Sequence, residues 1–265
     1  MITDKSGAQL VKAHAYGNDF VLMPADQAAA GAGRAALARA LCARHTGVGA
    51  DGLIVYAADG RMDLLNADGS YSEVSGNGVR CLAAWLARER GLRAGASIDI
   101  TTDAGVKRLA LLSVDGARYT FRAAMGQPEE LQKRTIEVDG IPVEAITLRV
   151  GNPQCVVLGP VTQERLHTIA AKLAVHRVFP QGSNVELAAL EAPDRVRILI
   201  WERGVGPTEA SGTGACASAV AAIAYGGASR DVQVTAPGGT QRVEWSGDGI
   251  FLTGWAELVF TAARL

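Results

Sequence analysis

The chain of 265 residues has almost no excess of charge of either sign. Its 26 basic residues nearly balance 27 acidic ones, which gives a formal net charge of −1. A surface that binds nucleic acid or an anionic membrane carries a basic excess, so we expect neither of these partners. A small molecule is the partner class that remains.

Cysteine is scarce, and its spacing does not resemble that of a metal site. Cys42, Cys81, Cys155 and Cys216 form no CxxC pair. Because zinc sites need closely spaced Cys or His ligands, we expect no bound metal. We interpret the four residues as reduced, buried thiols of a cytoplasmic protein.

Long apolar segments and targeting features are also missing. The most apolar stretch, residues 215–223, falls well short of the ~20 residues that a membrane span requires. No charged segment followed by an apolar one opens the sequence, so no signal peptide is expected. We therefore predict a cytoplasmic location without membrane contact.

Glycine is frequent, at 31 residues, and the motifs that contain it recur. Gly17-Asn18 is repeated as Gly151-Asn152, 134 positions later. The turn Ser75–Gly78 is repeated as Ser211–Gly214, 136 positions later, and both turns read Ser-Gly-x-Gly. These repeats at nearly one offset predict an internal duplication with two similar domains.

Polar residues precede both turns at the same distance. Asn66 lies nine positions before Ser75, and Glu202 lies nine before Ser211. This third match in the same order strengthens the prediction of a duplication. We place an N-terminal domain at 1–124, to which a strand in 252–265 returns, and a C-terminal domain at 125–251.

Apolar periodicity indicates the main helices and strands. Strands are expected at 52–56, 61–66, 97–102, 119–123, 145–150, 155–158, 196–201, 232–235 and 255–262. Helices are expected at 35–44, 79–90, 164–174 and 215–224. Each Ser-Gly-x-Gly turn therefore opens a helix.

A helix N-terminus presents unpaired N–H groups and partial positive charge, so each turn is suited to bind an anion. Its glycines let a ligand approach the backbone closely. The simpler alternative is that each serine only caps its helix. A phosphate-binding loop is disfavoured because neither turn has the required lysine. Ser211 also lacks the GxSxG context of a hydrolase nucleophile.

Eight segments in the same order resemble the diaminopimelate epimerase family, whose members are cofactor-independent amino-acid epimerases. The segments are His14–Phe20, Arg44–Gly52, Asn66–Ser70, Ser75–Cys81, Gly151–Pro153, Ser183–Val185, Trp201–Gly204 and Ser211–Ala217. The resemblance implies an α/β (α+β) fold of two pseudo-symmetric domains, each a mostly antiparallel, β-barrel-like sheet around a central helix. It also implies a substrate held between the domains, a homodimer, and interconversion of LL- and meso-diaminopimelate in lysine and peptidoglycan biosynthesis.

The resemblance also implies which residues bind the substrate. Those implied to contact its distal amino and carboxylate groups, or to orient its centre, are Asn18, Asn66, Asn152, Asn184, Glu202 and Arg203. Those implied to bind the reacting carboxylate through the helix N-termini are Gly76, Asn77, Gly212 and Thr213.

Three positions depart from the family pattern. Ser75 and Ser211 stand where the family has its two catalytic acid/base cysteines, and Gln154 replaces a supporting histidine. With Glu202, these three residues make up the four predicted catalytic positions. A hydroxyl is far less acidic than a thiol, so we expect very low epimerase activity. Cys81 and Cys216 lie inside the predicted helices and are not expected to substitute.

The four histidines do not supply a replacement base. We interpret His14 and His45 as structural and His167 and His176 as surface residues.

Three hypotheses remain open. The first is a diaminopimelate epimerase in which both cysteines were deliberately exchanged for serine. The second is a divergent homologue that acts on another amino acid or uses Glu202 as a single base. The third is a non-catalytic protein that kept the amino-acid pocket.

Overall fold

The computed structural model describes residues 9–28, 30–31 and 33–263, which divide into two compact units. Unit 1 extends to Arg122 and resumes at Trp255, and unit 2 comprises Ala123–Gly254. The chain passes from one unit to the other twice, once in β8 (Arg118–Gly126) and once in β17 (Gly249–Ala263).

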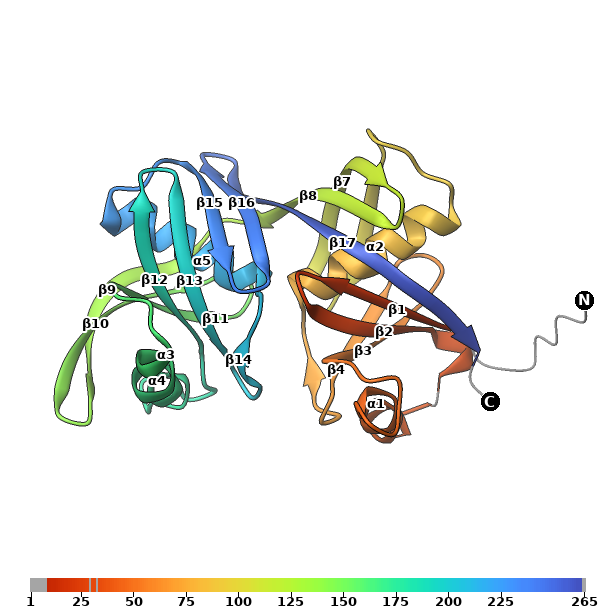
Figure 1. Ribbon diagram of the computed structural model, residues 1–265, viewed down its shortest axis with the longest axis horizontal. Coiled ribbons are helices and arrows are strands. Elements are labelled where there is room, and N and C mark those ends of the chain that lie inside the picture. The colour runs from red at the N-terminus through yellow and green to blue at the C-terminus, as the bar shows by residue number, and fades with distance from the viewer. Residues whose placement is uncertain (1–8, 29, 32, 264–265) are drawn as a thin grey trace, which may run out of the picture. The chain divides into compact units, whose positions relative to one another are not determined.

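Unit 1 is built largely from strands (Figure 1). Its other elements are β1 (Gln9–Ala15), β2 (Asn18–Pro24), η1 (Ala25–Gln27), α1 (Gly33–Cys42), β3 (Gly52–Tyr56), β4 (Met62–Asn66), β5 (Tyr71–Ser72), α2 (Gly76–Glu89), β6 (Ser97–Thr102) and β7 (Gly105–Asp115). The pairs β1–β2, β3–β4, β4–β5 and β6–β7 are antiparallel. β2 and β3 are parallel, and α1 provides the crossover that a parallel pair requires.

Helix α2 forms the centre of unit 1. Residues 77–87 are buried, and the helix packs against β1, β2, β3, β6 and β7. A helix that buries residues all round its circumference belongs in a core rather than on a surface. The strands therefore wrap around α2 and fix where its N-terminus lies.

Unit 2 repeats this order of elements (Figure 1). Its further elements are β9 (Glu129–Val138), β10 (Ile141–Arg149), β11 (Pro153–Leu158), α3 (Gln163–Arg165), η2 (Leu166–Ala170), α4 (Ala171–Ala174), β12 (Asn184–Ala192), β13 (Arg195–Glu202), β14 (Gly206–Thr208), α5 (Gly212–Ala221), η3 (Ala222–Gly226), β15 (Asp231–Ala236) and β16 (Gly239–Ser246). β11–β12 and β13–β15 are parallel. The pairs β9–β10, β10–β11, β12–β13, β13–β14, β15–β16 and β16–β17 are antiparallel.

Helix α5 is the counterpart of α2. All ten of its residues are buried, and it packs against β10, β11, β12, β13, β15 and β16. The strand pairs β10–β11, β11–β12 and β12–β13 match β1–β2, β2–β3 and β3–β4 in order and direction. The predicted fold class is confirmed: each unit is a mostly antiparallel sheet around a central helix, and the units are pseudo-symmetric. Within the described residues, no helix is long and apolar enough to cross a membrane.

Candidate active site

Both Ser-Gly-x-Gly turns adopt the same local geometry. Ser75 precedes α2 with φ −130° and ψ 123°, and its Oγ accepts a hydrogen bond from the Gly78 N–H at 3.1 Å. Ser211 precedes α5 with φ −136° and ψ 129°, and its Oγ accepts from the Gly214 N–H, also at 3.1 Å. Each serine thus caps its helix, and the cap leaves the first-turn N–H groups pointing out of the helix end.

The surroundings of the two caps differ. Ser75 is half-buried, whereas Ser211 is buried and its Oγ lies 3.5 Å from the Thr213 Oγ1. The Gln241 side chain donates to the Ser211 carbonyl at 3.5 Å. The turn of unit 2 is therefore the more enclosed of the two.

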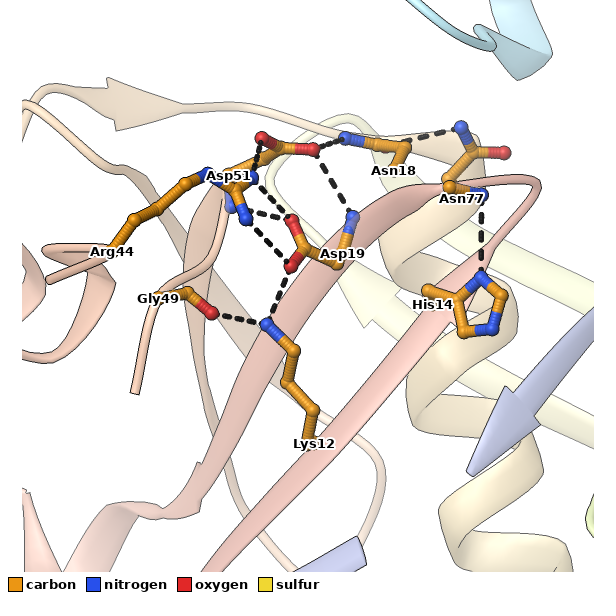
Figure 2. Close-up of polar contacts among 9 residues, drawn as sticks. Lys12, His14, Asn18, Asp19, Arg44, Gly49, Asp51 and Asn77 are labelled. Carbon is orange, nitrogen blue, oxygen red and sulfur yellow. Dashed lines mark hydrogen bonds and ion pairs between the residues drawn. The ribbon is translucent and has the colours of Figure 1, made fainter. Parts of the chain in front are cut away.

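The first turn of α2 is tied to β2 through amide side chains (Figure 2). Asn77, which is 1% exposed, donates its Nδ2 hydrogen to the Asn18 Oδ1 at 3.0 Å. The Asn77 Oδ1 accepts a hydrogen bond from Arg80. Asn18 in turn donates to the Asp51 Oδ2 at 2.8 Å. Two predicted substrate-binding residues, Asn18 and Asn77, are thus in direct contact.

A charged cluster holds Asn18 and Asp51 in place (Figure 2). Asp19 and Asp51 exchange backbone-to-carboxylate hydrogen bonds of 3.0 and 3.1 Å. Arg44 reaches both carboxylates, at 2.9 and 2.7 Å, and Lys12 reaches Asp19 at 2.5 Å. Burial alone raises the pKa of Asp19, but hydrogen bonds from Arg44 and Lys12 outweigh it and hold that pKa below its ordinary value.

We expect Asp19→Asn to lower the free energy of unfolding by about 1.5–3 kcal/mol at pH 7, because it weakens hydrogen bonds to charged groups. A carboxyl whose pKa is depressed by folding stabilises the protein above its unfolded pKa of about 3.9, and this contribution is lost as the pH falls through the folded pKa. Urea unfolding between pH 7 and pH 3 should therefore show the variant and the unaltered chain converging at acid pH.

The matched control is Asp99→Asn, which alters an exposed ion pair with Arg108 and should change stability little at either pH. A difference for Asp19→Asn that stays constant down to pH 3 would contradict the role assigned to its charge.

Asn66 ends β4 and donates to the Ser70 Oγ at 2.9 Å. The register of β3 and β4 places it opposite Gly52. The Phe20 ring lies 3.3 Å from where a Cβ on Gly52 would be and 3.6 Å from the corresponding point on Gly78. One aromatic ring therefore connects the end of the β3–β4 pair with the first turn of α2.

In unit 2, three neighbouring strands carry the predicted polar residues. Gln154 of β11 lies opposite Asn184 of β12. The Asn184 side chain accepts a hydrogen bond from the backbone N–H of Arg203 at 2.9 Å. Arg203 directly follows Glu202, the last residue of β13. Gln154 is 1% exposed and donates to the Asn152 Oδ1 at 2.5 Å. These five residues form one polar cluster.

The Arg203 guanidinium is exposed and only partly engaged. Its Nη1 donates to the Gln181 carbonyl at 3.2 Å, and its stem packs against Gly182. A guanidinium carries five N–H donors. Among the residues that the structure describes, the guanidinium of Arg203 donates a hydrogen bond to Gln181, so other donors of Arg203 remain for an anionic ligand.

A cavity of about 340 Å³ lies beside Gln154 in unit 2. Arg134 and Arg149 line it, together with the buried Thr147. In the described part of the chain, the Thr147 Oγ1 and Gln154 Oε1 have no hydrogen-bond partner. The cavity therefore offers positive charge and polar side-chain oxygens next to the predicted site.

Sequence reasoning missed Glu186, a fully buried residue of β12. A Cβ built on Gly214 would lie 2.5 Å from the Glu186 Oε1, so this carboxyl lies against the first turn of α5. Burial, and then the charge of Glu202, raise the pKa of Glu186 well above its ordinary value. The available indication was a single acidic residue between Val185 and Leu187 in an otherwise apolar run.

Cys81, His14 and His167 make contacts that fit a structural role. Cys81 is fully buried in α2, and burial raises its pKa to about 12. His14 accepts a hydrogen bond from the Gly17 N–H and packs edge-on against Trp255, and His167 packs against Trp201. Within residues 9–28, 30–31 and 33–263, no group of three or more His, Cys, Asp or Glu side chains is placed to hold a metal.

Solved structures of other proteins share this fold. A hydroxyproline epimerase from Agrobacterium vitis matches 97% of this chain and 91% of its own with a TM-score of 0.72 at 14% identity. A phenazine biosynthesis protein from Bacillus anthracis matches 98% and 99% with a TM-score of 0.73 at 15% identity. At such identities the likeness concerns the fold.

Sequence relatives define the family more narrowly. The diaminopimelate epimerase from Desulforudis audaxviator is 40% identical over 275 residues, covering 95% of this chain and 97% of the relative. The one from Desulfitobacterium hafniense is 38% identical over 280 residues, covering 97% and 98%. The family model described as diaminopimelate epimerase matches residues 10–131 and 146–259. The chain belongs to the diaminopimelate epimerase family.

Proposed function

We propose that this chain binds one molecule of diaminopimelate per chain as a member of a cofactor-independent epimerase family. The observation that carries the proposal is the pair of serine-capped helix N-termini with the same geometry, one in each pseudo-symmetric unit. An epimerase needs one acid/base position for each face of the α-carbon, and the two turns supply two such positions.

The substrate's reacting carboxylate is assigned to the first-turn amides of α2 and α5, at Gly76, Asn77, Gly212 and Thr213. Helix N-termini bind carboxylates through N–H groups without intrahelical partners and through the helix dipole. All four residues belong to the first turns that the serine caps open. The same interaction stabilises the negative charge that develops when the α-proton leaves.

The distal end of the substrate carries both an ammonium and a carboxylate group. The unit 2 cluster pairs a carboxyl, Glu202, with an arginine, Arg203, and with the amides of Asn152 and Asn184. Asn18 and Asn66 contribute further amides from unit 1. This mixture of acceptors and donors suits an amino acid head group better than a simple dicarboxylate or a diamine.

The chemistry at the centre is limited by Ser75 and Ser211. A thiol has a pKa near 8.5 and becomes a usable base at a helix N-terminus, whereas a hydroxyl at neutral pH does not. Losing one matched acid/base group costs about 10²–10⁴ in rate, so two-base epimerisation by the serine form is expected to be very slow.

A non-catalytic amino-acid-binding protein is the second candidate. It is favoured by the roles that both serines already fill as helix caps, since a cap needs no acid/base chemistry. Ligand binding alone does not separate it from a weakened epimerase, but activity restored by thiols does.

Binding selectivity tests the proposal. Titration calorimetry should show diaminopimelate binding more tightly than lysine, which lacks the distal carboxylate, and than pimelate, which lacks both amino groups. Arg203→Gln should weaken diaminopimelate binding by about 10- to 100-fold because a charge-assisted hydrogen bond is lost.

The control is Arg195→Gln, which removes an exposed arginine at the start of β13, the strand after which Arg203 follows directly. This variant should bind as the unaltered chain does. Equal affinity for the three ligands, or equal loss in both variants, would contradict the assignment of Arg203.

A further inference from the structure

Glu186 is a buried acid that the proposed chemistry does not yet use. Its side chain is 0% exposed, and among the described residues neither carboxyl oxygen has a hydrogen-bond partner. A buried polar group without a partner costs about 1–3 kcal/mol of stability, and more when it is charged. Such a group therefore calls for a functional explanation.

Its position relates Glu186 to Ser211. The point where a Cβ on Gly214 would lie is 2.5 Å from the Glu186 Oε1 and 3.1 Å from the Ser211 Oγ. The carboxyl and the hydroxyl thus approach the same side of the first turn of α5. A side chain at position 214 would crowd both groups, and glycine leaves them room.

The equivalent position in unit 1 is apolar. There, the point where a Cβ on Gly78 would lie is 3.1 Å from the Ile54 Cδ1 and 3.4 Å from the Ser75 Cβ. Two turns with the same backbone geometry therefore have chemically different neighbours. A carboxyl lies beside the turn that contains Ser211, and a hydrocarbon side chain lies beside the turn that contains Ser75.

The groups around Glu186 favour its protonated form. Glu202 acts on it from β13, and Cys155 of β11 is near enough for the two groups to influence each other's pKa. The pKa of Glu186 is raised mainly by its burial and secondly by the charge of Glu202. Burial, and then the charge of Glu186, likewise raise the pKa of Cys155. A carboxylate with a raised pKa is a stronger base than an ordinary one, as general base catalysis near neutral pH requires.

We propose that Glu186 is a positioning residue that accepts a proton through Ser211, so that only unit 2 retains a functional acid/base pair. This rests on the proposed function. The bond between the substrate α-carbon and its hydrogen breaks, the proton passes to the Ser211 Oγ, and the serine's own proton passes to the Glu186 carboxylate. The electron pair delocalises into the substrate carboxylate, and the reverse transfers return a proton to the same face.

Proton exchange is expected on only one face of the substrate α-carbon. Ser75 has Ile54 rather than a carboxyl behind it, so no proton is delivered to the opposite face of the α-carbon. Of LL- and meso-diaminopimelate, only the isomer that presents its α-hydrogen to Ser211 should exchange that hydrogen with solvent, and it should keep its configuration. The exchange rate should rise with pH as Glu186 becomes ionised.

The test is to incubate the intact chain with each isomer in D₂O and to follow α-deuteration and isomer composition by NMR. We expect deuteration of one isomer at one α-position without conversion to the other isomer. In Glu186→Gln the rate should fall about 100-fold or more and lose its pH dependence, while the dissociation constant measured by calorimetry stays unchanged.

Two further variants keep the test decisive. Ser211→Ala should also stop the exchange, which covers the case that Glu186→Gln does not fold. Glu191→Gln, an exposed carboxyl on the same strand, should leave it unchanged.

Equal exchange of both isomers, or exchange that persists in Glu186→Gln, would overturn the proposal. Binding of diaminopimelate without any exchange would overturn it while leaving the proposed function intact. Absence of binding would instead overturn the proposed function as well.

Discussion

Replacing Ser75 and Ser211 together by cysteine should raise the rate of diaminopimelate epimerisation by about 10²–10⁴-fold or more. Together the replacements restore a matched acid/base pair, and one missing member of such a pair already costs about 10²–10⁴ in rate. Both positions are helix N-caps, where the dipole and first-turn N–H groups stabilise a thiolate. Sulfur replaces oxygen with little change in shape, so the turns should keep their geometry.

The two single variants serve as controls for this prediction. Epimerisation needs one group to remove a proton and another to deliver one to the opposite face. Ser211→Cys alone leaves Ser75 without an acid/base group, so it should give much less than half of the double variant's logarithmic gain. Ser75→Cys alone should give the larger gain of the two, because Ser211 and Glu186 would supply the second group. The measurement is the rate of interconversion of LL- and meso-diaminopimelate, followed by chiral chromatography. A folded double variant that binds diaminopimelate but epimerises no faster than the unaltered chain would favour the non-catalytic binding protein.

Asn77→Ala should lower the free energy of unfolding by about 3 kcal/mol. Asn77 is 1% exposed, and its side chain joins the Asn18 Oδ1 to the buried Arg80. Removing it takes an acceptor from a buried guanidinium and a donor from an amide oxygen, and each loss costs about 1–3 kcal/mol. The same variant should weaken diaminopimelate binding, because the first turn of α2 loses its tie to β2.

Urea unfolding measured by circular dichroism checks the stability change. Asn66→Ala is the matched control, since Asn66 is only half-buried and, within the described residues, its side chain donates one hydrogen bond, to Ser70. It should cost about 1 kcal/mol or less. A loss for Asn77→Ala no larger than this would show that the amide does not support Arg80.

The elements best predicted from sequence are those whose pattern is unambiguous. The strands expected at 52–56 and 97–102 are β3 and β6 with the same limits. The helices expected at 79–90 and 215–224 begin three residues earlier than expected, in α2 and α5. They begin there because the serine caps set the start, whereas the apolar pattern becomes visible only after the glycines.

Other strands had no clear pattern. β9 exposes most of its first six residues, so its sequence reads as polar loop rather than as strand. β12 opens with five consecutive buried residues, but Asn184 and Glu186 among them are polar, so the sequence shows neither a continuous apolar run nor a clear alternation. The helix expected at 164–174 is interrupted by the π-helical turn η2, which local periodicity does not predict.

The same limit applies to the site. The two turns and their serines were visible because they recur in sequence, and the cap geometry follows from the residue types. Glu186 contacts a residue 28 positions away, on another element. Its importance depends on burial and on the missing side chain of Gly214, and neither follows from local sequence. The Asp19–Arg44–Asp51 cluster likewise forms only when β2 and β3 pair.

The central proposal is that the chain binds a single molecule of diaminopimelate. Titration calorimetry of the intact chain with LL- or meso-diaminopimelate measures it directly as a stoichiometry. One molecule bound per chain is the predicted result. Its affinity should fall when either Ser-Gly-x-Gly turn is altered. Two molecules per chain, or no binding, would contradict the account.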